Sequence, residues 1–297
     1  MKTNKFYIII TTLFSLTFLL INPALSKTLT VPDSYPTIQG AVNAAANGDI
    51  IQVAGGTYTE NVLVNTPVTI RGKDGAADTI VVAAVKNTAV FAVVASDVTI
   101  SGFTVKGADG HLNATGVLIG GRFPGDTLYV GQVGDVTISK CIVEFNGQGI
   151  YVWGANNTTI VNNTVRYNSS VPADGNAGTG IIAWAETGPT ALDTSIVNNE
   201  VYENYKFGIF IGATNETDFG GTKINGNNLY LNGDYGGDYN WLGMGFMNAT
   251  GSIKVSGNKI LATTSGLDIW VSNAPGLRTV GNPIRTDLGP NIPMPTP

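Results

Sequence analysis

Large aromatic residues recur along the chain in segments that alternate between apolar and other side chains. Tyr151 and Trp153 share one such segment, and Trp184, Phe210 and Trp270 lie in later ones. In a strand, successive side chains point to opposite faces, so these five face away from the inward Ile and Val residues. Sugar rings stack on flat aromatic faces through their C–H edges, and a regular row of rings would follow an extended glycan. The five residues are therefore predicted to bind a polysaccharide.

Insertions flank these aromatic segments and are predicted to form the walls of a binding groove. Their Gly, Pro, Asp and Tyr content suits binding loops on a rigid scaffold. Arg122, which opens the longest insertion, is the best candidate to meet a negatively charged polymer. Two alternatives remain: the insertions cover the aromatic row as a satellite apolar cluster, or the row binds a partner protein. The insertions are Gly121 to Gly134, Ser169 to Thr179, Glu186 to Thr194 and Gly233 to Leu242.

Three carboxylates are candidate acids or bases for cleaving a polysaccharide. Glu186 directly follows the Trp184 segment, and Asp268 is expected to point outward beside Trp270. They lie about three repeats apart, or roughly 14 Å at about 4.8 Å per repeat, beyond the about 5–9.5 Å that paired glycosidase carboxylates need. Asp238, on an insertion between them, could bridge this gap. A lyase or hydrolase using Glu186, Asp238 or Asp268 is thus an alternative to binding alone.

The elements that must hold these side chains form a repeat. It takes 22 residues from Ile138 to Ile160 and returns, lengthened by insertions, between about Ile70 and Trp270. The unit is predicted to be a strand, an Asn turn and a second strand that begins with glycine and an apolar residue. In the last repeat, this second strand is predicted to begin at Gly266-Leu267. Six repeats can be aligned on an inward apolar residue, namely Ile100, Ile138, Ile160, Ile196, Ile224 and Val255. The column three residues further on reads Phe103, Cys141, Asn163, Asn199, Asn227 and Asn258. The column eight residues further on includes Asn146, Asn168, Asn204 and Asn232.

This period predicts an all-β fold, a parallel solenoid over residues 27–281. It is too short for a propeller blade and lacks the framework of a leucine-rich repeat. Coils stacked about 4.8 Å apart turn each column into a ladder of like residues. Asparagine tolerates a left-handed bend, and its amide can donate to and accept from the Asn of the next coil. Phe103 and Cys141 share one Asn column, which is therefore expected to point into the core.

The two ends of the chain differ from the repeat. Residues 1–26 carry Lys2 and Lys5 before an apolar run and are predicted to be a cleaved secretory signal peptide, with a retained membrane anchor as the alternative. Residues 36–46 have helical spacing and are expected to cap the first coil, just before a first strand at residues 49–53. Residues 282–297 contain five prolines and read as an irregular tail.

Charge and the metal-binding residue types limit the partners. Without Lys2 and Lys5 the chain has 14 Lys and Arg against 21 Asp and Glu, a formal charge of −7, which disfavours nucleic acid. His111 is the only histidine and Cys141 the only cysteine, so no metal or other cofactor is expected, and calcium enters only as a bridge to an acidic polymer.

Glu144, Arg166, Tyr202 and Glu203 fall on another face and are expected to be a solvated surface. We expect a secreted or periplasmic monomer with no membrane attachment after cleavage.

The columns resemble the right-handed parallel β-helix repeats of the pectin lyase-like superfamily. The segments Thr37-Ile38-Gln39 and Thr69-Ile70-Arg71-Gly72 are similar to the first coils of pectin methylesterases. The central Asn-rich coils are similar to those of the copper-accessory proteins of nitrous oxide reductase maturation. The resemblance implies a single-stranded right-handed β-helix with a short N-terminal capping helix. It implies no activity, because the catalytic motifs of the esterases, pectate lyases and polygalacturonases have no counterpart here.

Three functions remain open. The first is binding of an extended polysaccharide along the aromatic row. The second is a polysaccharide lyase or hydrolase acting on a pectin-like polymer. The third is a non-catalytic envelope scaffold or accessory protein whose solenoid face binds another protein.

Overall fold

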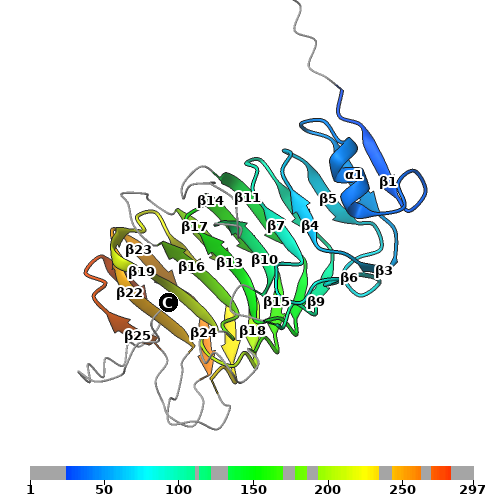
Figure 1. Ribbon diagram of the computed structural model, residues 1–297. Coiled ribbons are helices and arrows are strands. Elements are labelled where there is room, and N and C mark those ends of the chain that lie inside the picture. The colour runs from blue at the N-terminus through cyan, green and yellow to red at the C-terminus, as the bar shows by residue number, and fades with distance from the viewer. Residues whose placement is uncertain are drawn as a thin grey trace, which may run out of the picture.

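The chain forms a parallel β-solenoid with three faces. The computed structural model describes residues 25–110, 114–121, 133–169, 178–185, 193–233, 243–261 and 269–281. Within these ranges it has 26 strands and one helix. The strands form three sheets, called A, B and C here, in which every pairing is parallel, and successive coils stack side by side along one axis (Figure 1). The predicted all-β solenoid with a short N-terminal helix is confirmed.

Each complete coil contributes one strand to each sheet. Sheet A contains β1 (Thr28–Val31), β2 (Ile50–Val53), β5 (Thr69–Gly72), β8 (Thr99–Ser101), β11 (Gly134–Ser139), β14 (Asn156–Val161), β17 (Thr194–Val197), β20 (Lys223–Asn225), β23 (Ile253–Ser256) and β26 (Leu277–Val280). Sheet B contains β3 (Gly56–Thr59), β6 (Thr79–Val82), β9 (Thr104–Lys106), β12 (Ile142–Glu144), β15 (Thr164–Arg166), β18 (Glu200–Tyr202), β21 (Asn228–Tyr230) and β24 (Lys259–Leu261). Sheet C contains β4 (Val62–Val64), β7 (Phe91–Val93), β10 (Thr115–Gly120), β13 (Gln148–Trp153), β16 (Ile181–Ala185), β19 (Ile209–Asp218), β22 (Met244–Thr250) and β25 (Ile269–Ser272).

The repeating unit has one more strand than the sequence predicted. The short apolar segment between the two Asn columns is a separate three-residue strand, such as β12, and it builds sheet B. Each Asn column therefore marks a corner, the first between sheets A and B and the second between sheets B and C. A three-residue strand is too short to show alternation in a sequence, which is why the unit was predicted with two strands.

The core lies between the three sheets. Its inward columns are closed to solvent: Ile100, Ile138 and Ile160 in sheet A are 0 % exposed. Phe103 and Cys141 are buried as expected, and burial raises the pKa of the Cys141 thiol to about 11, so the thiol stays protonated. None of the helical structure in the described ranges has the length and hydrophobicity that a membrane crossing requires.

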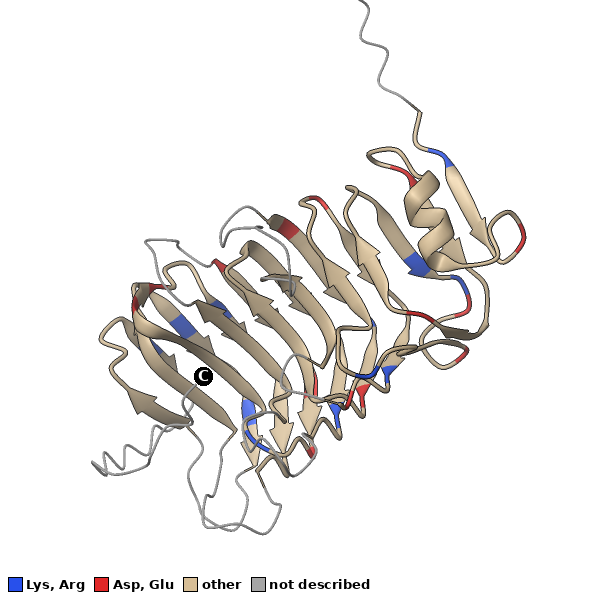
Figure 2. Ribbon diagram, viewed as in Figure 1, with Lys and Arg blue, Asp and Glu red and all other residues tan. Residues whose placement is uncertain are grey.

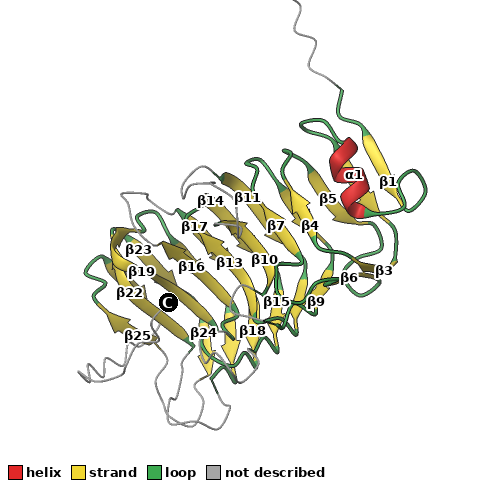
Figure 3. Cartoon of the chain, in the orientation of Figure 1, coloured by secondary structure: helices red, strands yellow, loops and turns green. Residues whose placement is uncertain are grey.

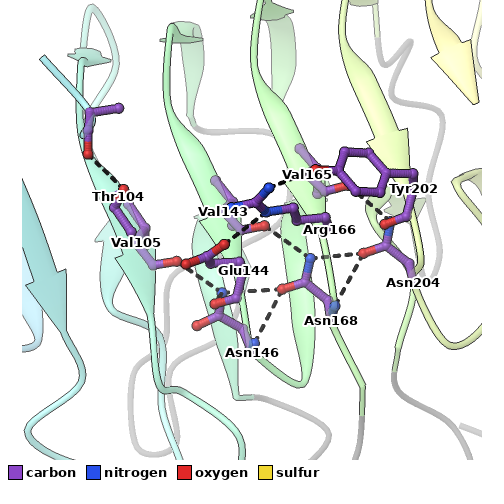
Figure 4. A network of polar contacts seen from close by, with 11 residues as sticks. Thr104, Val105, Val143, Glu144, Asn146, Val165, Arg166, Asn168, Tyr202 and Asn204 are labelled. Atoms are coloured by element: carbon purple, nitrogen blue, oxygen red, sulfur yellow. Dashed lines mark hydrogen bonds and ion pairs between the residues drawn. The ribbon is translucent and has the colours of Figure 1, made fainter.

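Two ladders of asparagines tie the coils together at the corners. In the first, the Nδ2 group of Asn163 donates to Oδ1 of Asn199 at 3.0 Å, and Asn199 donates likewise to Asn227 at 3.0 Å. Each Nδ2 also donates to a backbone carbonyl of sheet A; for Asn199 this is the carbonyl of Ile160, at 2.9 Å. Figure 4 shows the second ladder, from Asn146 through Asn168 to Asn204. Because both donors and the acceptor are used, these buried amides leave no polar atom without a partner.

Helix α1 (Ile38–Ala44) closes the N-terminal end of the core (Figure 3). Its Ile38, Ala41 and Val42 side chains are buried. The helix is shorter than the residues 36–46 expected, since Ala45 has an extended backbone. The expected first strand, at residues 49–53, is in fact the second. β1 precedes the helix and pairs in parallel with β2, with Thr28 opposite Ile50.

Glu60 anchors the start of the capping helix. Its carboxylate accepts hydrogen bonds from the backbone N–H groups of Ile38, at 2.9 Å, and Gln39, at 3.0 Å. These are N–H groups of the first turn, which have no partner inside a helix. Replacing Glu60 by alanine should therefore lower the free energy of unfolding by about 1–3 kcal/mol. Urea titration followed by circular dichroism would measure this, and an unchanged midpoint would show that water satisfies these groups equally well.

Candidate functional site

The outer face of sheet C carries the aromatic residues singled out by the sequence. The parallel register arranges them in two neighbouring columns, and all five are partly exposed, whereas Val152 and Ile211 between them are 0 % exposed. The first column reads Leu118, Tyr151, Ile182, Phe210, Gly245 and Trp270. The second reads Gly120, Trp153, Trp184, Gly212 and Met247. The aromatic side chains thus cross successive coils along the long axis of the molecule.

Trp270 lies in a different column from the one predicted. Taking Gly266-Leu267 as the opening of its strand placed Trp270 with Trp153 and Trp184. In the structure Ile269 pairs with Met244 and Trp270 with Gly245, which puts Trp270 in the column of Phe210. The error arises because no repeat pattern marks where β25 begins after β24.

The rings form two groups on this face. Tyr151 and Trp153 stack with centroids 5.4 Å apart and planes at 10°, beside the buried Leu118. Further along, Trp184 and Phe210 stack at 6.2 Å and 23°.

Phe207 completes the second group and was not predicted. Its ring lies 4.9 Å from that of Phe210 and 6.2 Å from that of Trp270, and only 5 % of the residue is exposed. Phe207 comes before Gly208 and strand β19, outside the segment in which inward and outward side chains alternate. The sequence pattern therefore gave no reason to select it. The aromatic surface therefore continues from β16 to β25 through Phe207.

Glycines let these rings lie close to the sheet. A Cβ atom on Gly245 would be 2.6 Å from Cε1 of Phe207 and 2.7 Å from Cδ2 of Phe210. A Cβ atom on Gly212 would be 2.8 Å from Cε1 of Phe210. All three distances are shorter than any normal carbon contact, so the rings occupy the space that side chains would fill. The result is a low aromatic surface rather than a set of isolated projecting rings.

The strands of sheet C carry almost no charge. Among the described residues, their charged side chains are Glu216 and Asp218, both near the end of β19. Figure 2 shows charged residues mainly at the turns and on the other sheets. The aromatic face therefore offers stacking and apolar contact, and any charge that meets a ligand must come from residues beside it.

The charged candidates fall outside the described residues. Glu186, Asp238, Asp268 and Arg122 all do so, as does His111, and their roles stay predictions. Within the part of the chain that the structure describes, no group of three or more His, Cys, Asp or Glu residues could hold a metal ion.

Lys206 lies three residues before strand β19 and is a titratable residue that the sequence gave no reason to select. It is 5 % exposed and directly precedes Phe207, and its backbone N–H donates to the carbonyl of Gly178 at 2.9 Å. Burial lowers the pKa of its ammonium group to about 8 from an ordinary 10.5, because the charged form loses hydration. Because groups with such shifted pKa values are concentrated at functional sites, Lys206 is a candidate general base.

The lowered pKa of Lys206 predicts a pH dependence of stability. The unfolded chain holds this proton up to about pH 10.5 and the folded chain only up to about pH 8, so stability rises as the pH increases between these values. We expect a gain on the order of 1–3 kcal/mol over this range. Lys206→Met should remove it, and chemical unfolding of both proteins at pH 7 and pH 10 would show this. Parallel pH profiles would contradict the assignment.

The charged cluster on sheet B is not the simple solvated surface that was expected. Glu144 is only 8 % exposed and its carboxylate accepts from Nε of Arg166 at 2.8 Å. Arg166 also donates to the Tyr202 hydroxyl at 2.6 Å, as Figure 4 shows, and its guanidinium lies 5.3 Å from the ring centroid of Tyr167. The hydrogen bonds to Tyr202 and Glu144 raise the pKa of Arg166, so this cation is permanent.

The three-sheet geometry agrees with the family to which the sequence is matched. The family described as "Right handed beta helix region" matches residues 68–284, well over half of the chain. The chain belongs to this right-handed β-helix family. The predicted right-handed β-helix is thereby confirmed. No curated protein matches the sequence significantly.

Solved structures share this β-helix at low sequence identity. Pectate lyase Pel9A has a TM-score of 0.58 and 12 % identity, over 90 % of this chain and 82 % of its own. ORF18 of Geobacillus virus E2 has a TM-score of 0.54 and 16 % identity over 83 % of this chain, which spans only 53 % of the viral protein. Alginate lyase from Paenibacillus sp. str. FPU-7 has a TM-score of 0.52 and 16 % identity, over 87 % and 97 % of the two chains. At these identities the likeness establishes the fold alone.

Proposed function

We propose that this β-helix binds an extended polysaccharide along the outer face of sheet C. The observation that carries the proposal is the pair of aromatic columns, with Tyr151, Trp153, Trp184, Phe210 and Trp270 partly exposed on one face. From β13 to β25 there are four strand spacings, or about 19 Å, which is long enough for several sugar rings. Aromatic side chains on a rigid sheet supply contact area at little cost in conformational entropy.

A polysaccharide suits this surface better than a protein or a nucleic acid. The aromatic residues extend along successive coils, and the strands that carry them are nearly uncharged, so these strands offer almost no contacts to the phosphates on which nucleic-acid binding depends. Two solved structures with the same fold are named as a pectate lyase and an alginate lyase, which supports a glycan as the ligand class.

We place the protein outside the cytoplasm as a secreted or periplasmic monomer of residues 27–297, with residues 1–26 removed.

Polysaccharide cleavage is the second candidate function, and Lys206 is the observation that favours it. The Lys206 amine has a lowered pKa, and its residue precedes Phe207 in the chain, so it could remove a proton from a uronate during elimination. Glu186, Asp238 and Asp268 are proposed to supply further acid or base groups. Unsaturated sugar ends released by the wild type and not by Lys206→Met would support cleavage. Their absence from every polymer that binds would leave binding alone.

A glycan array tests the proposed function. Purified residues 27–297 would be applied with calcium and with a chelator. We expect binding to one class of extended polymer, and equal binding in chelator if the aromatic contacts dominate. Silence across the array, together with specific recovery of an envelope protein, would overturn the proposal and favour the scaffold hypothesis.

A further inference from the structure

A second, separate aromatic stack lies at the corner where sheet B turns into sheet C. Phe145 and Tyr167 follow β12 and β15 directly, and their rings stack with centroids 5.3 Å apart and planes at 12°. The corresponding residues of the next two coils are Glu203 and Leu231. Phe145 is 52 % exposed, although a ring of this size normally gains from burial. The stack is therefore open to solvent at its Phe145 end.

The backbone at this corner would suit smaller residues better. Phe145 has φ +55° and Tyr167 φ +53°, in the left-handed region that side chains with a Cβ rarely adopt. At the corner between sheets A and B the left-handed positions are mostly filled by glycine or asparagine, such as Gly102, Asn162, Asn198 and Gly226. Stacking on Tyr167 offsets part of the cost of this backbone conformation and uses only one face of Phe145. Bulky residues held at such angles are concentrated at functional sites.

The second face of Phe145 is left uncovered by the preceding coil. The residue beside it there is Gly107, whose backbone N–H donates to the Phe145 carbonyl at 3.1 Å and which has no side chain. Tyr167 covers the opposite face. A flat apolar platform thus faces the N-terminal coils.

The coil that leaves Phe145 uncovered also carries a cation. Lys106 lies opposite Glu144 in the register of β9 and β12, one residue before Gly107. The Glu144 carboxylate is paired with Arg166, and among the described residues no carboxylate forms an ion pair with Lys106. In the described part of the chain, the coil that leaves this ring open thus carries a lysine that forms no ion pair, one residue before Gly107.

We propose that this corner binds a uronate residue, whose pyranose ring stacks on the open face of Phe145 while its carboxylate pairs with Lys106. A single ammonium group beside one flat ring matches the single negative charge of a uronate. The formal charge of −7 on residues 27–297 disfavours a densely charged polyanion at the same place. This site is distinct from the aromatic face of sheet C, which has no cation on its strands, and it does not depend on the function proposed for that face.

The test uses oligogalacturonate as the probe and Trp184→Ala as the background, so that the sheet C face is already weakened. Isothermal titration should show saturable binding in this background. Phe145→Asn, which suits the left-handed backbone, should reduce the affinity about tenfold, and Lys106→Gln about threefold. Leu231→Asn is the matched control, since Leu231 occupies the same column at φ +53° and is 47 % exposed; it should change nothing. Carboxyl-reduced oligomers lack the charge that pairs with Lys106. They should therefore bind the Trp184→Ala protein with the same affinity whether or not it also carries Lys106→Gln.

Two outcomes would overturn the uronate site. One is the absence of oligogalacturonate binding in the Trp184→Ala background. The other is equal affinity for Phe145→Asn and Leu231→Asn, with both proteins folded by circular dichroism. Failure of the sheet C proposal gives a different result, in which Trp184→Ala binds polysaccharide as tightly as the wild type.

Discussion

Replacing Trp184 by alanine should weaken polysaccharide binding by about 2 kcal/mol or more, roughly thirtyfold, because Trp184 lies at the centre of the aromatic face. It is flanked by Trp153 in one coil and stacks on Phe210 in the next. Losing it would remove the ring that lies between Trp153 and Phe210 in successive coils. Affinity for the polymer selected by the array, measured by isothermal titration, would show the loss, and Trp184→Phe should restore most of it.

The control for Trp184 is Thr159→Ala on the outer face of sheet A. Thr159 is a partly exposed residue in a coil of the same solenoid, in a strand without aromatic residues. The Thr159→Ala protein should bind the polysaccharide with the same affinity as the wild type. Because the stacking is not ionic, the effect of Trp184→Ala should also be the same at low and high salt. Equal affinity for Trp184→Ala and Thr159→Ala would place the polymer elsewhere.

Replacing Asn199 by leucine should lower the free energy of unfolding by about 3–5 kcal/mol, because Asn199 is an interior member of a fully paired ladder. Its side chain accepts from the backbone N–H and the Nδ2 of Asn163, and donates to Ile160 and Asn227. Asn199 is 1 % exposed, so water cannot replace these bonds. Leucine has a similar volume but leaves buried donors and acceptors on both neighbouring coils unpaired. Chemical unfolding followed by circular dichroism would measure the change.

The matched comparison for Asn199 is Asn258, at the C-terminal end of the same ladder. Asn258 also accepts from Asn227 and donates to a backbone carbonyl, but it is 7 % exposed. Asn258→Leu should therefore cost less than Asn199→Leu. If both variants unfold at the wild-type denaturant concentration, the ladders do not stabilise the fold.

The inward columns and the outer aromatic residues were predictable from the sequence, because parallel stacking places like residues in register and alternation separates the two faces. Ile138 and Ile160 are paired in register in sheet A, as their common column predicted. Trp153 and Trp184 are paired on the outer face of sheet C, as the alternation predicted. The column of Trp270 was not predictable. The spacing between β24 and β25 follows no repeat, so the start of the last aromatic strand could not be located.

Interactions between coils were also hidden from the sequence. Arg166 lies 22 residues from Glu144 and 36 from Tyr202, and their network exists only because β12, β15 and β18 are adjacent in sheet B. The burial of Lys206 has the same origin, since a charged residue after an Asn turn is usually solvated. Both became visible once the register of the sheets was known.

Tryptophan fluorescence during titration with the polymer chosen by the array tests the central claim most directly. Three of the four tryptophans, Trp153, Trp184 and Trp270, lie on the outer face of sheet C. If the polymer lies along this face, their emission should shift saturably and become protected from iodide quenching, with the affinity found by calorimetry. If calorimetry shows binding while emission and quenching stay unchanged, the polysaccharide does not lie on the aromatic face of sheet C.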